Sequence, residues 1–486
     1  MKTSNIKKIL IIIISMVCSV AGYSQQSDSL TYYLETAAKN NPTVLQRYNE
    51  YQASLQKVPQ VGSLPDPQLE LGVFLSPMEL ISGNQVADIK LMQMFPWFGV
   101  LKNAKDEMSL MAKARFETFR DAKLQVYYDV QSAWYDLYKV RQDIRISEKN
   151  INLLKTIERL TLVKYRSGSV GSSSSSSASK MSGGTAPTAS SGTSGTSGMN
   201  TMGGGNSDAS LSVSTSQLPA APMGSSKGGT GLSDVYQIQI EKGDLENNLA
   251  SLKNEEKIVI ARFNSLLNRP QNTPVTGADL LPAEALDSSY LKVSDSMFIN
   301  NPMLGMLQYE QQSLAARKKM QKQMGFPMVG LGVNYTVINK SEMSTSSMNG
   351  QDMIMPMVTL TLPVYRKKYK AMQIETNYLK TASEQNYQTT ANSLQTEYYQ
   401  ALQLYNDAQR RMKLYESQSV LAKKTLDIQI KTYSTSNSSM TDILRTRLQL
   451  FDYEFKQVEA LTDYNKSIAL INRLTAFSIH NNTVKE

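Results

Sequence analysis

The chain has 486 residues, a formal net charge of +9 from 51 Lys and Arg against 42 Asp and Glu, one histidine and one cysteine. The basic residues are spread along the chain without an evident cluster, which argues against nucleic-acid binding. The histidine, His480, lies in a polar tail, and the cysteine, Cys18, lies near the N-terminus. With no phosphate-binding glycine loop and no paired carboxylates at an interpretable spacing, we expect neither an enzyme nor a resident cofactor.

Residues 1–24 have the three parts of a secretory signal peptide: three lysines, the apolar run Ile9–Val17, and small residues ahead of Ser24. Removing this segment would lower the net charge from +9 to +6, because three lysines leave with it. Lipidation of Cys18 is a minor alternative, because bulky Val17 stands where a small residue is wanted. After Val20 no apolar run approaches the ~20 residues that a membrane-spanning helix needs.

A repeat organises the remaining chain. The segment Asn40-Asn41-Pro42 recurs 260 residues later as Asn300-Asn301-Pro302, and a further proline follows each copy by 25 residues, at Pro67 and Pro327. Spacing kept this closely predicts two copies of one unit, each composed of a helix, a β-hairpin, a long helix, a turn and a second long helix. The predicted segments are a first repeat at 25–268, a proline-containing linker at 269–289, a second repeat at 290–478 and a polar tail at 479–486.

The two hairpins are predicted at about 67–96 and 327–363. Apolar residues alternate with small or polar ones, as in Leu69, Leu71 and Val73 of the first hairpin. An isolated hairpin is unstable in water and leaves its edges open, so we expect these strands to find partners in other chains.

Each hairpin ends at a proline that precedes a long helix. Pro96 is followed by Trp97, Phe98 and Gly99, and Pro363 is followed two residues later by Tyr365. Proline withdraws a backbone donor from the strand ladder, and glycine lets the chain turn. The helix predicted over Leu101–Arg166 would be ~100 Å long at 1.5 Å per residue, which indicates coiled-coil packing.

The two helix–helix turns differ in length. In the second repeat only Ser434–Thr441 separates the helices, whereas in the first repeat residues 168–231 intervene and consist mostly of Ser, Gly, Thr and Ala. Such a segment buries too little apolar surface to fold, so we predict a disordered insertion at a helix tip. It is either an inert spacer or a tether for a partner.

Together these features resemble the outer-membrane factor family, the TolC-like proteins. The best local matches are the Asn-Asn-Pro segments, the strand-to-helix prolines and the two helix tips. The resemblance implies a mostly α fold with a small β part, in which three chains give four strands each to one twelve-stranded outer-membrane β-barrel that a periplasmic α-helical barrel continues. It also implies a location in the cell outer membrane, spanning into the periplasm.

The resemblance assigns the helix tips to the periplasmic entrance. Asp442 matches an early aspartate of the family pattern, Arg445 stands where a second acidic residue is expected, and Tyr433 matches a tyrosine that helps to hold the entrance shut. A ring of three Asp442 side chains would concentrate cations unless Arg445 neutralises it; the alternative is that Asp442 only caps a helix. The predicted entrance residues are Tyr165, Asp234, Tyr433, Asp442 and Arg445.

The aromatic junction residues Trp97, Phe98 and Tyr365 form either a girdle at the membrane surface or ordinary packing at a turn. Methionine side chains are the candidate ligands for a metal. Thioethers suit Cu(I), but methionine is common throughout this chain, with 25 residues. The candidate ligands are Met343, Met348, Met353, Met355 and Met357.

The function implied is the exit duct of a tripartite efflux or type I secretion system, with heavy-metal efflux of the RND type as one option. The implied partners are two further copies of the chain, a periplasmic adaptor protein, an inner-membrane RND or ABC transporter and outer-membrane lipid. The rival prediction is a periplasmic coiled-coil adaptor or scaffold without a pore. An adaptor needs a domain rich in short strands between its helices, and this chain instead offers two alternating hairpins.

Overall fold

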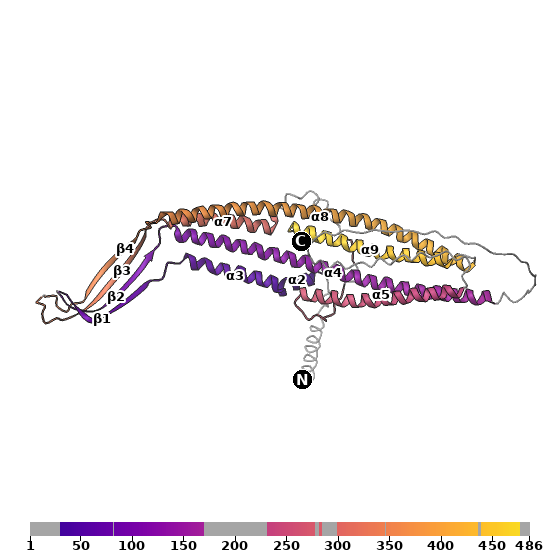
Figure 1. Ribbon diagram of the computed structural model, residues 1–486, viewed down its shortest axis with the longest axis horizontal. Helices are drawn as coiled ribbons and strands as arrows, with labels where there is room; N and C mark the ends of the chain where they lie inside the picture. The colour runs from indigo at the N-terminus through magenta and orange to yellow at the C-terminus, as the bar shows by residue number, and fades with distance from the viewer. Residues whose placement is uncertain are drawn as a thin grey trace, which may run out of the picture.

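The computed structural model describes residues 30–80, 82–169, 231–277, 281–283, 299–345, 347–435 and 439–476. The predicted signal peptide with Cys18, most of the predicted insertion, much of the linker and the tail with His480 lie outside these residues. The described part is a long bundle of helices with a sheet at one end (Figure 1). Among its helices, none is sufficiently long and apolar to cross a membrane.

The four strands form one antiparallel sheet in the order β1-β2-β3-β4. Its central pair joins the two hairpins, since β2 pairs with β3 from Asn84 opposite Asn339 to Phe95 opposite Val329. Within the described residues the outer edges of β1 and β4 pair with no strand. The strands are β1 (Gln68–Leu80), β2 (Gly83–Phe95), β3 (Met328–Asn339) and β4 (Met353–Thr361).

The register places apolar side chains on one face of the sheet. Leu69 lies opposite Leu91, Leu91 opposite Val333, and Val333 opposite Pro356. Leu69, Leu91 and Val333 are between 47% and 61% exposed, so this apolar face is not covered within the chain. The other face is polar or small: the Lys90 ammonium lies 3.3 Å from the Glu70 carboxylate, and Asn334 is their neighbour on β3.

Helices precede and follow each hairpin, and in the first segment two helices, α2 and α3, precede the hairpin where one was predicted. Two of them, α4 and α8, have 70 residues each and reach ~105 Å at 1.5 Å per residue. The first repeat contains α2 (Leu30–Asn40), α3 (Pro42–Gly62), α4 (Val100–Ser169) and α5 (Gly231–Leu266), and the second contains α7 (Pro302–Gln323), α8 (Arg366–Thr435) and α9 (Met440–Leu474).

The repeated Asn-Asn-Pro segment has the same structural task in each repeat. The side-chain oxygens of Asn41 and Asn301 each accept a hydrogen bond from the backbone N–H two residues later at 2.9 Å, which caps α3 and α7. Their amide nitrogens donate to the carbonyl oxygens of Leu266 and Leu474, the last residues of α5 and α9, at 2.8 and 3.0 Å. The motif therefore ties the start of α3 to the end of α5, and the start of α7 to the end of α9.

Aromatic side chains of the helices lie in the core. Tyr33 of α2 packs against Trp134 of α4 and Phe263 of α5, with ring centroids 5.4 and 5.0 Å apart. In the second repeat Tyr405 of α8 lies against Tyr464 of α9 with centroids 5.0 Å apart. Along α8 the buried residues Tyr398, Ala401, Tyr405 and Ala408 alternate between large and small, which suits close packing of neighbouring helices.

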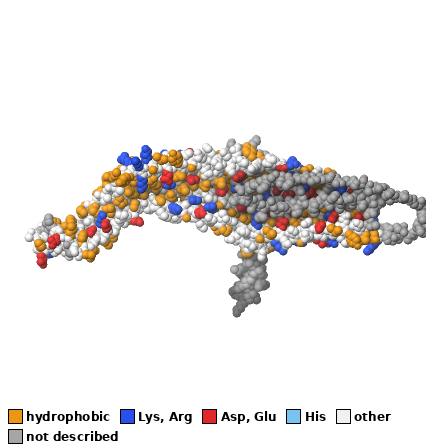
Figure 2. Space-filling model, in the orientation of Figure 1, with side chains coloured by type: hydrophobic (Ala, Val, Ile, Leu, Met, Phe, Trp, Pro, Cys, Tyr) orange, Lys and Arg blue, Asp and Glu red, His pale blue; other side chains and the backbone are white. Residues whose placement is uncertain are grey.

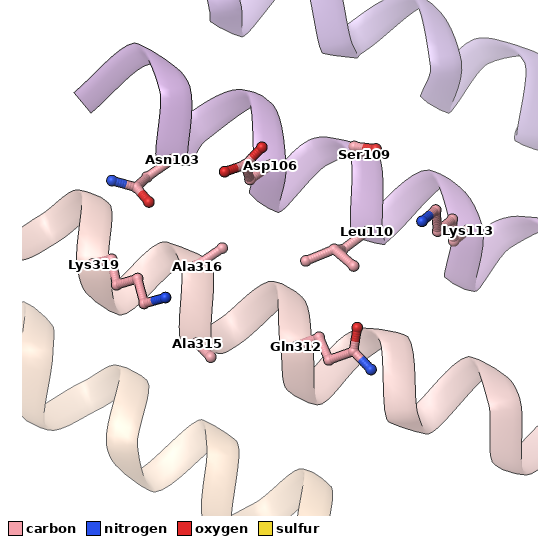
Figure 3. A pocket seen from close by; sticks show the side chains of 9 residues that line it. All are labelled: Asn103, Asp106, Ser109, Leu110, Lys113, Gln312, Ala315, Ala316 and Lys319. Atoms are coloured by element: carbon pink, nitrogen blue, oxygen red, sulfur yellow. The ribbon is translucent and has the colours of Figure 1, made fainter. Parts of the chain in front are cut away.

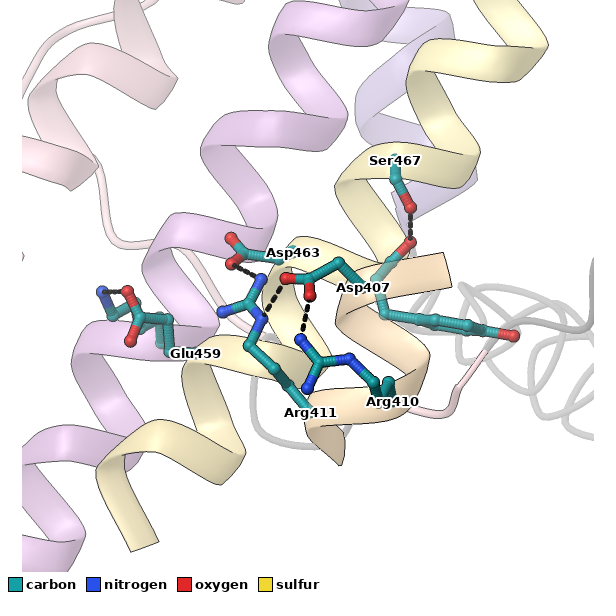
Figure 4. Close-up of polar contacts among 8 residues, drawn as sticks. Asp407, Arg410, Arg411, Glu459, Asp463 and Ser467 are labelled. Carbon is teal, nitrogen blue, oxygen red and sulfur yellow. Dashed lines mark hydrogen bonds and ion pairs between the residues drawn. The ribbon is translucent and has the colours of Figure 1, made fainter. Parts of the chain in front are cut away.

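Ion pairs cross between the long helices at mid-bundle (Figure 4). The Arg411 guanidinium of α8 donates to Asp407 on its own helix at 2.8 Å and to Asp463 on α9 at 2.9 Å. Three residues farther along α9, Lys466 lies 2.5 Å from Asp136 of α4. These pairs fix the register of α9 between α4 and α8.

Candidate functional site

The four long helices end together at the end of the molecule far from the sheet (Figure 1). One apolar core joins their tips and contains Leu154 of α4, Ile238 of α5, Tyr433 of α8 and Ile443 of α9, all buried. Since each helix contributes to this core, the tips pack as one unit that holds the polar groups around it.

Lys164, near the end of α4, lies against Tyr433. Its ammonium nitrogen is 3.8 Å from the centroid of the Tyr433 ring and donates to the Tyr433 carbonyl oxygen at 3.2 Å. Asp234 of α5 lies close to this pair. Burial raises the pKa of Asp234, and the Lys164 charge partly opposes that rise; burial also raises the pKa of the Tyr433 phenol, against a hydrogen bond with Thr161. The structure therefore brings together two predicted entrance residues, Tyr433 and Asp234, around a lysine that the sequence analysis had not singled out.

A second polar contact at the tips is a buried ion pair between the repeats. Arg447 of α9 donates to Glu241 of α5 at 2.7 Å, and its side chain is only 3% exposed. Burial lowers the pKa of Arg447 and raises that of Glu241, while their mutual attraction opposes both shifts. Two further guanidinium nitrogens, Nε and Nη1, are buried without a partner among the described residues. Sequence reasoning missed both residues.

The other predicted entrance residues are exposed. Asp442 and Arg445 stand three positions apart on α9, and Tyr165 is 41% exposed on α4. Ser439 occupies the N-cap position of α9 but its side chain makes no capping bond, so Asp442 supplies the negative charge in the first turn. Its carboxylate can therefore stabilise the N-terminus of α9 electrostatically and still be exposed to solvent.

The predicted aromatic residues at the junction between sheet and helices differ in their packing. Trp97 stacks on Phe326, which precedes β3, with ring centroids 5.3 Å apart. Phe98 and Tyr365 are 87% and 85% exposed, so they pack against little within the chain. Gly99 has φ +86°, a conformation that side-chain-bearing residues rarely adopt.

Pro96 and Pro363 stand at the junction between each hairpin and the long helix that follows. Pro96 directly follows the end of β2 at Phe95, and Pro363 lies in the short stretch between the end of β4 at Thr361 and the start of α8.

The methionine candidates lie on the second hairpin. Met353, Met355 and Met357 alternate along β4 and share the polar face of the sheet. The register adds two methionines of β2 to that face: Met92 lies opposite Gly332, which lies opposite Met357, and the Met94 sulfur fills the space above Gly330. Met343 and Met348 precede β4 and are exposed. No group of three or more His, Cys, Asp or Glu able to hold a metal occurs among the described residues.

A groove of about 420 Å³ runs between α4 and α7 close to the sheet (Figure 3). Its polar lining mixes one carboxylate, Asp106, with two lysines, Lys113 and Lys319. This mixture of charges selects no particular ligand. The other lining residues are Asn103, Ser109, Leu110, Gln312, Ala315 and Ala316.

A buried carboxylate lies at mid-bundle. Asp143 of α4 is 6% exposed, and one of its oxygens has no hydrogen-bond partner in the described part of the chain. Burial raises its pKa to about 7; Lys139 opposes this shift, whereas Glu255 of α5 and Glu459 of α9 add to it.

No protein-family description matches this sequence, and no curated protein does. Solved structures match over most of the chain. The outer-membrane channel OprN superposes with a TM-score of 0.67 at 12% identity, covering 92% of this chain and 90% of OprN. The outer membrane protein VceC of Vibrio cholerae gives 0.64 at 12% identity, over 92% and 96%. The open state of the Neisseria gonorrhoeae MtrE outer membrane channel gives 0.64 at 12% identity, over 92% and 88%.

The predicted fold is therefore confirmed: the chain has the fold of these outer-membrane channels.

Proposed function

We propose that this chain is one protomer of a trimeric outer-membrane channel, the exit duct of a tripartite efflux or type I secretion system. It has no catalytic role on this proposal. Three copies close their sheets into one twelve-stranded barrel in the outer membrane, and the helices continue as a tunnel into the periplasm. Transport is passive in this chain and is driven by an inner-membrane RND or ABC transporter through a periplasmic adaptor.

The observation that carries the proposal is the sheet. Its two edges, β1 and β4, pair with no strand in the described residues, and one whole face exposes leucine and valine side chains such as Leu71, Val358 and Leu360. In water such a sheet would aggregate through its edges and its apolar face. Pairing β1 of one copy with β4 of the next removes the edges, and lipid covers the apolar face.

The helix tips are then the periplasmic entrance and the docking site for the adaptor. The contact of Lys164 with Tyr433 and the Glu241–Arg447 pair hold α4, α5, α8 and α9 together there. Exposed Asp442 and Arg445 lie at the mouth, where a charged ring affects which ions enter. Phe98 and Tyr365, exposed at the junction, anchor the barrel at the membrane surface.

Soft metal ions are one candidate cargo class. Methionines of β2 and β4 line the polar face of the sheet, which becomes the barrel interior, and thioethers are soft ligands for Cu(I). If soft metal ions are exported, a double variant in which Met92 and Met357 are both changed to leucine lowers the resistance of cells to Cu(I) or Ag(I). Their resistance to detergents or dyes stays unchanged.

Membrane fractionation with cross-linking separates this proposal from the scaffold alternative. A barrel protein stays in the outer membrane after carbonate washing and cross-links as a trimer. A periplasmic scaffold is released by the wash, and this result would refute the channel.

A further inference from the structure

Four basic residues gather at the start of α8, directly after the junction: Arg366, Lys367, Lys368 and Lys370, all exposed. Figure 2 shows Lys and Arg side chains grouped where the sheet meets the helices. The expectation that the basic residues form no cluster is therefore wrong at this position. Along the described part of α8 the first ion pair joins Lys380 to Glu384, so within the described residues none of the four has a carboxylate partner.

This cluster is unfavourable for the helix that carries it. Cations destabilise the first turn of a helix, where the backbone N–H groups already present positive charge, and α8 has no acidic residue there. Arg366 and Lys370 also repel each other as like charges four positions apart. The lysines on α7 near the sheet, Lys318, Lys319 and Lys322, differ because they lie toward the C-terminus of their helix, where cations are favourable.

The cluster adjoins exposed apolar side chains. Leu362, Val364 and Tyr365 are 60%, 75% and 85% exposed and lead directly from the apolar face of β4 into the basic residues. The start of α4 repeats this arrangement in the first repeat, with exposed Phe98 followed by exposed Lys102 and Lys105. Apolar surface bordered by cations is the pattern of a protein surface that lies at an anionic membrane interface.

We propose that the basic residues at the start of α8, with Lys102 and Lys105 of α4, form a collar that binds the phosphate headgroups of anionic phospholipids in the periplasmic leaflet of the outer membrane. The inference rests on the proposed function, because only an inserted barrel brings this junction to the leaflet surface. Bound headgroups supply the negative charge that the first turn of α8 lacks, and they fix how deeply the barrel sits.

The test compares two triple variants with the same change in charge. Lys367, Lys368 and Lys370 are changed together to glutamine; the matched control changes Lys413, Lys423 and Lys424, exposed farther along α8, to glutamine. Purified trimers are incubated with equal amounts of dioleoyl phosphatidylglycerol and dioleoyl phosphatidylcholine, washed, and analysed for retained lipid by mass spectrometry. We expect wild type and control to retain phosphatidylglycerol preferentially, and the collar variant to lose that preference on the order of tenfold. A Lys-to-Arg triple at the collar keeps it.

Two results would overturn the collar: no preference for phosphatidylglycerol in the wild type, or an equal loss of that preference in both glutamine variants. Before the lipid assay, part of each sample is cross-linked to count its chains, and its single-channel conductance is recorded in phosphatidylcholine bilayers. A conducting trimer without lipid preference refutes the collar alone, whereas a chain that neither trimerises nor conducts refutes the channel and the collar with it.

Discussion

At the scale of single residues, the contact between Lys164 and Tyr433 is the clearest candidate for holding the entrance shut. Changing Lys164 to glutamine removes a cation–π contact and a charged hydrogen bond, together worth roughly 1–2 kcal/mol. We expect the frequency of spontaneous opening in planar bilayers to rise about 5- to 30-fold. Lys155→Gln, on an exposed face of the same helix, is the matched control. Equal opening of Lys164→Gln and wild type would remove this contact from the gate.

The buried pair of Glu241 and Arg447 predicts a different pattern. Replacing Glu241 alone with glutamine leaves a buried guanidinium without its counter-ion, and we expect a cost of roughly 2–4 kcal/mol. Replacing both residues with methionine leaves no buried charge and costs less. Amide hydrogen exchange of α5 and α9 near the tips measures the loss of local stability. We expect faster exchange in the single variant than in the double variant. A double variant less stable than the single variant would contradict this expectation. It would show that the ion pair stabilises the fold by more than the free-energy cost of burying its two charges.

Asp143 predicts how stability depends on pH. Its pKa is raised from 3.8 to about 7 by burial, so between about pH 4 and 7 the folded chain keeps a proton that the unfolded chain has released. Stability therefore falls as pH rises through this window and levels off above it, by roughly 2–4 kcal/mol from this group. Asp143→Asn should be more stable than wild type at pH 8 and lack this part of the pH dependence in thermal unfolding. Asp427→Asn, at an exposed site on α8, should behave like wild type.

At the scale of elements, the turn from β2 into α4 depends on Gly99. A side chain there must adopt φ +86° and displace the end of the Gln323 side chain, whose amide nitrogen lies 2.6 Å from the position of the added carbon. We expect Gly99→Ala to destabilise the protein by about 1–2 kcal/mol. Gly243→Ala is the control, because nothing lies within 4 Å of the added carbon in α5 and alanine favours a helix. Heat stability of the assembled protein measures both; equal behaviour would contradict the strained turn.

Local patterns made the elements predictable from sequence. Alternation fixes the faces of Leu69 and Leu71, and the prolines mark where strands end. The tip contacts were not predictable, because Lys164 lies 269 positions from Tyr433 and Arg447 lies 206 positions from Glu241. The proximity of these residues depends on how the helices of one repeat pack against those of the other. The sequence around Lys164 or Arg447 does not indicate which residue will be its partner. The same holds for Met92, which only the pairing of β2 with β3 brings beside β4.

In the whole molecule, the two predicted repeats have matching contacts. Asn41 and Asn301 make the same pair of contacts in the two halves, so the last helix of each half is bonded back to the short helix that precedes its hairpin. The two hairpins then meet as β2 and β3 and leave β1 and β4 as open edges. An even number of strands per copy, all antiparallel, permits closure by rotation about one axis.

The proposed function requires that this chain forms a pore. The measurement that tests it most directly is single-channel recording of the purified, detergent-extracted protein in planar bilayers, with cross-linking of the same sample to count chains. We predict discrete conductance steps from a trimer, with more frequent opening in Lys164→Gln. A water-soluble monomer or dimer that produces no steps, in wild type and in Lys164→Gln alike, would contradict the account.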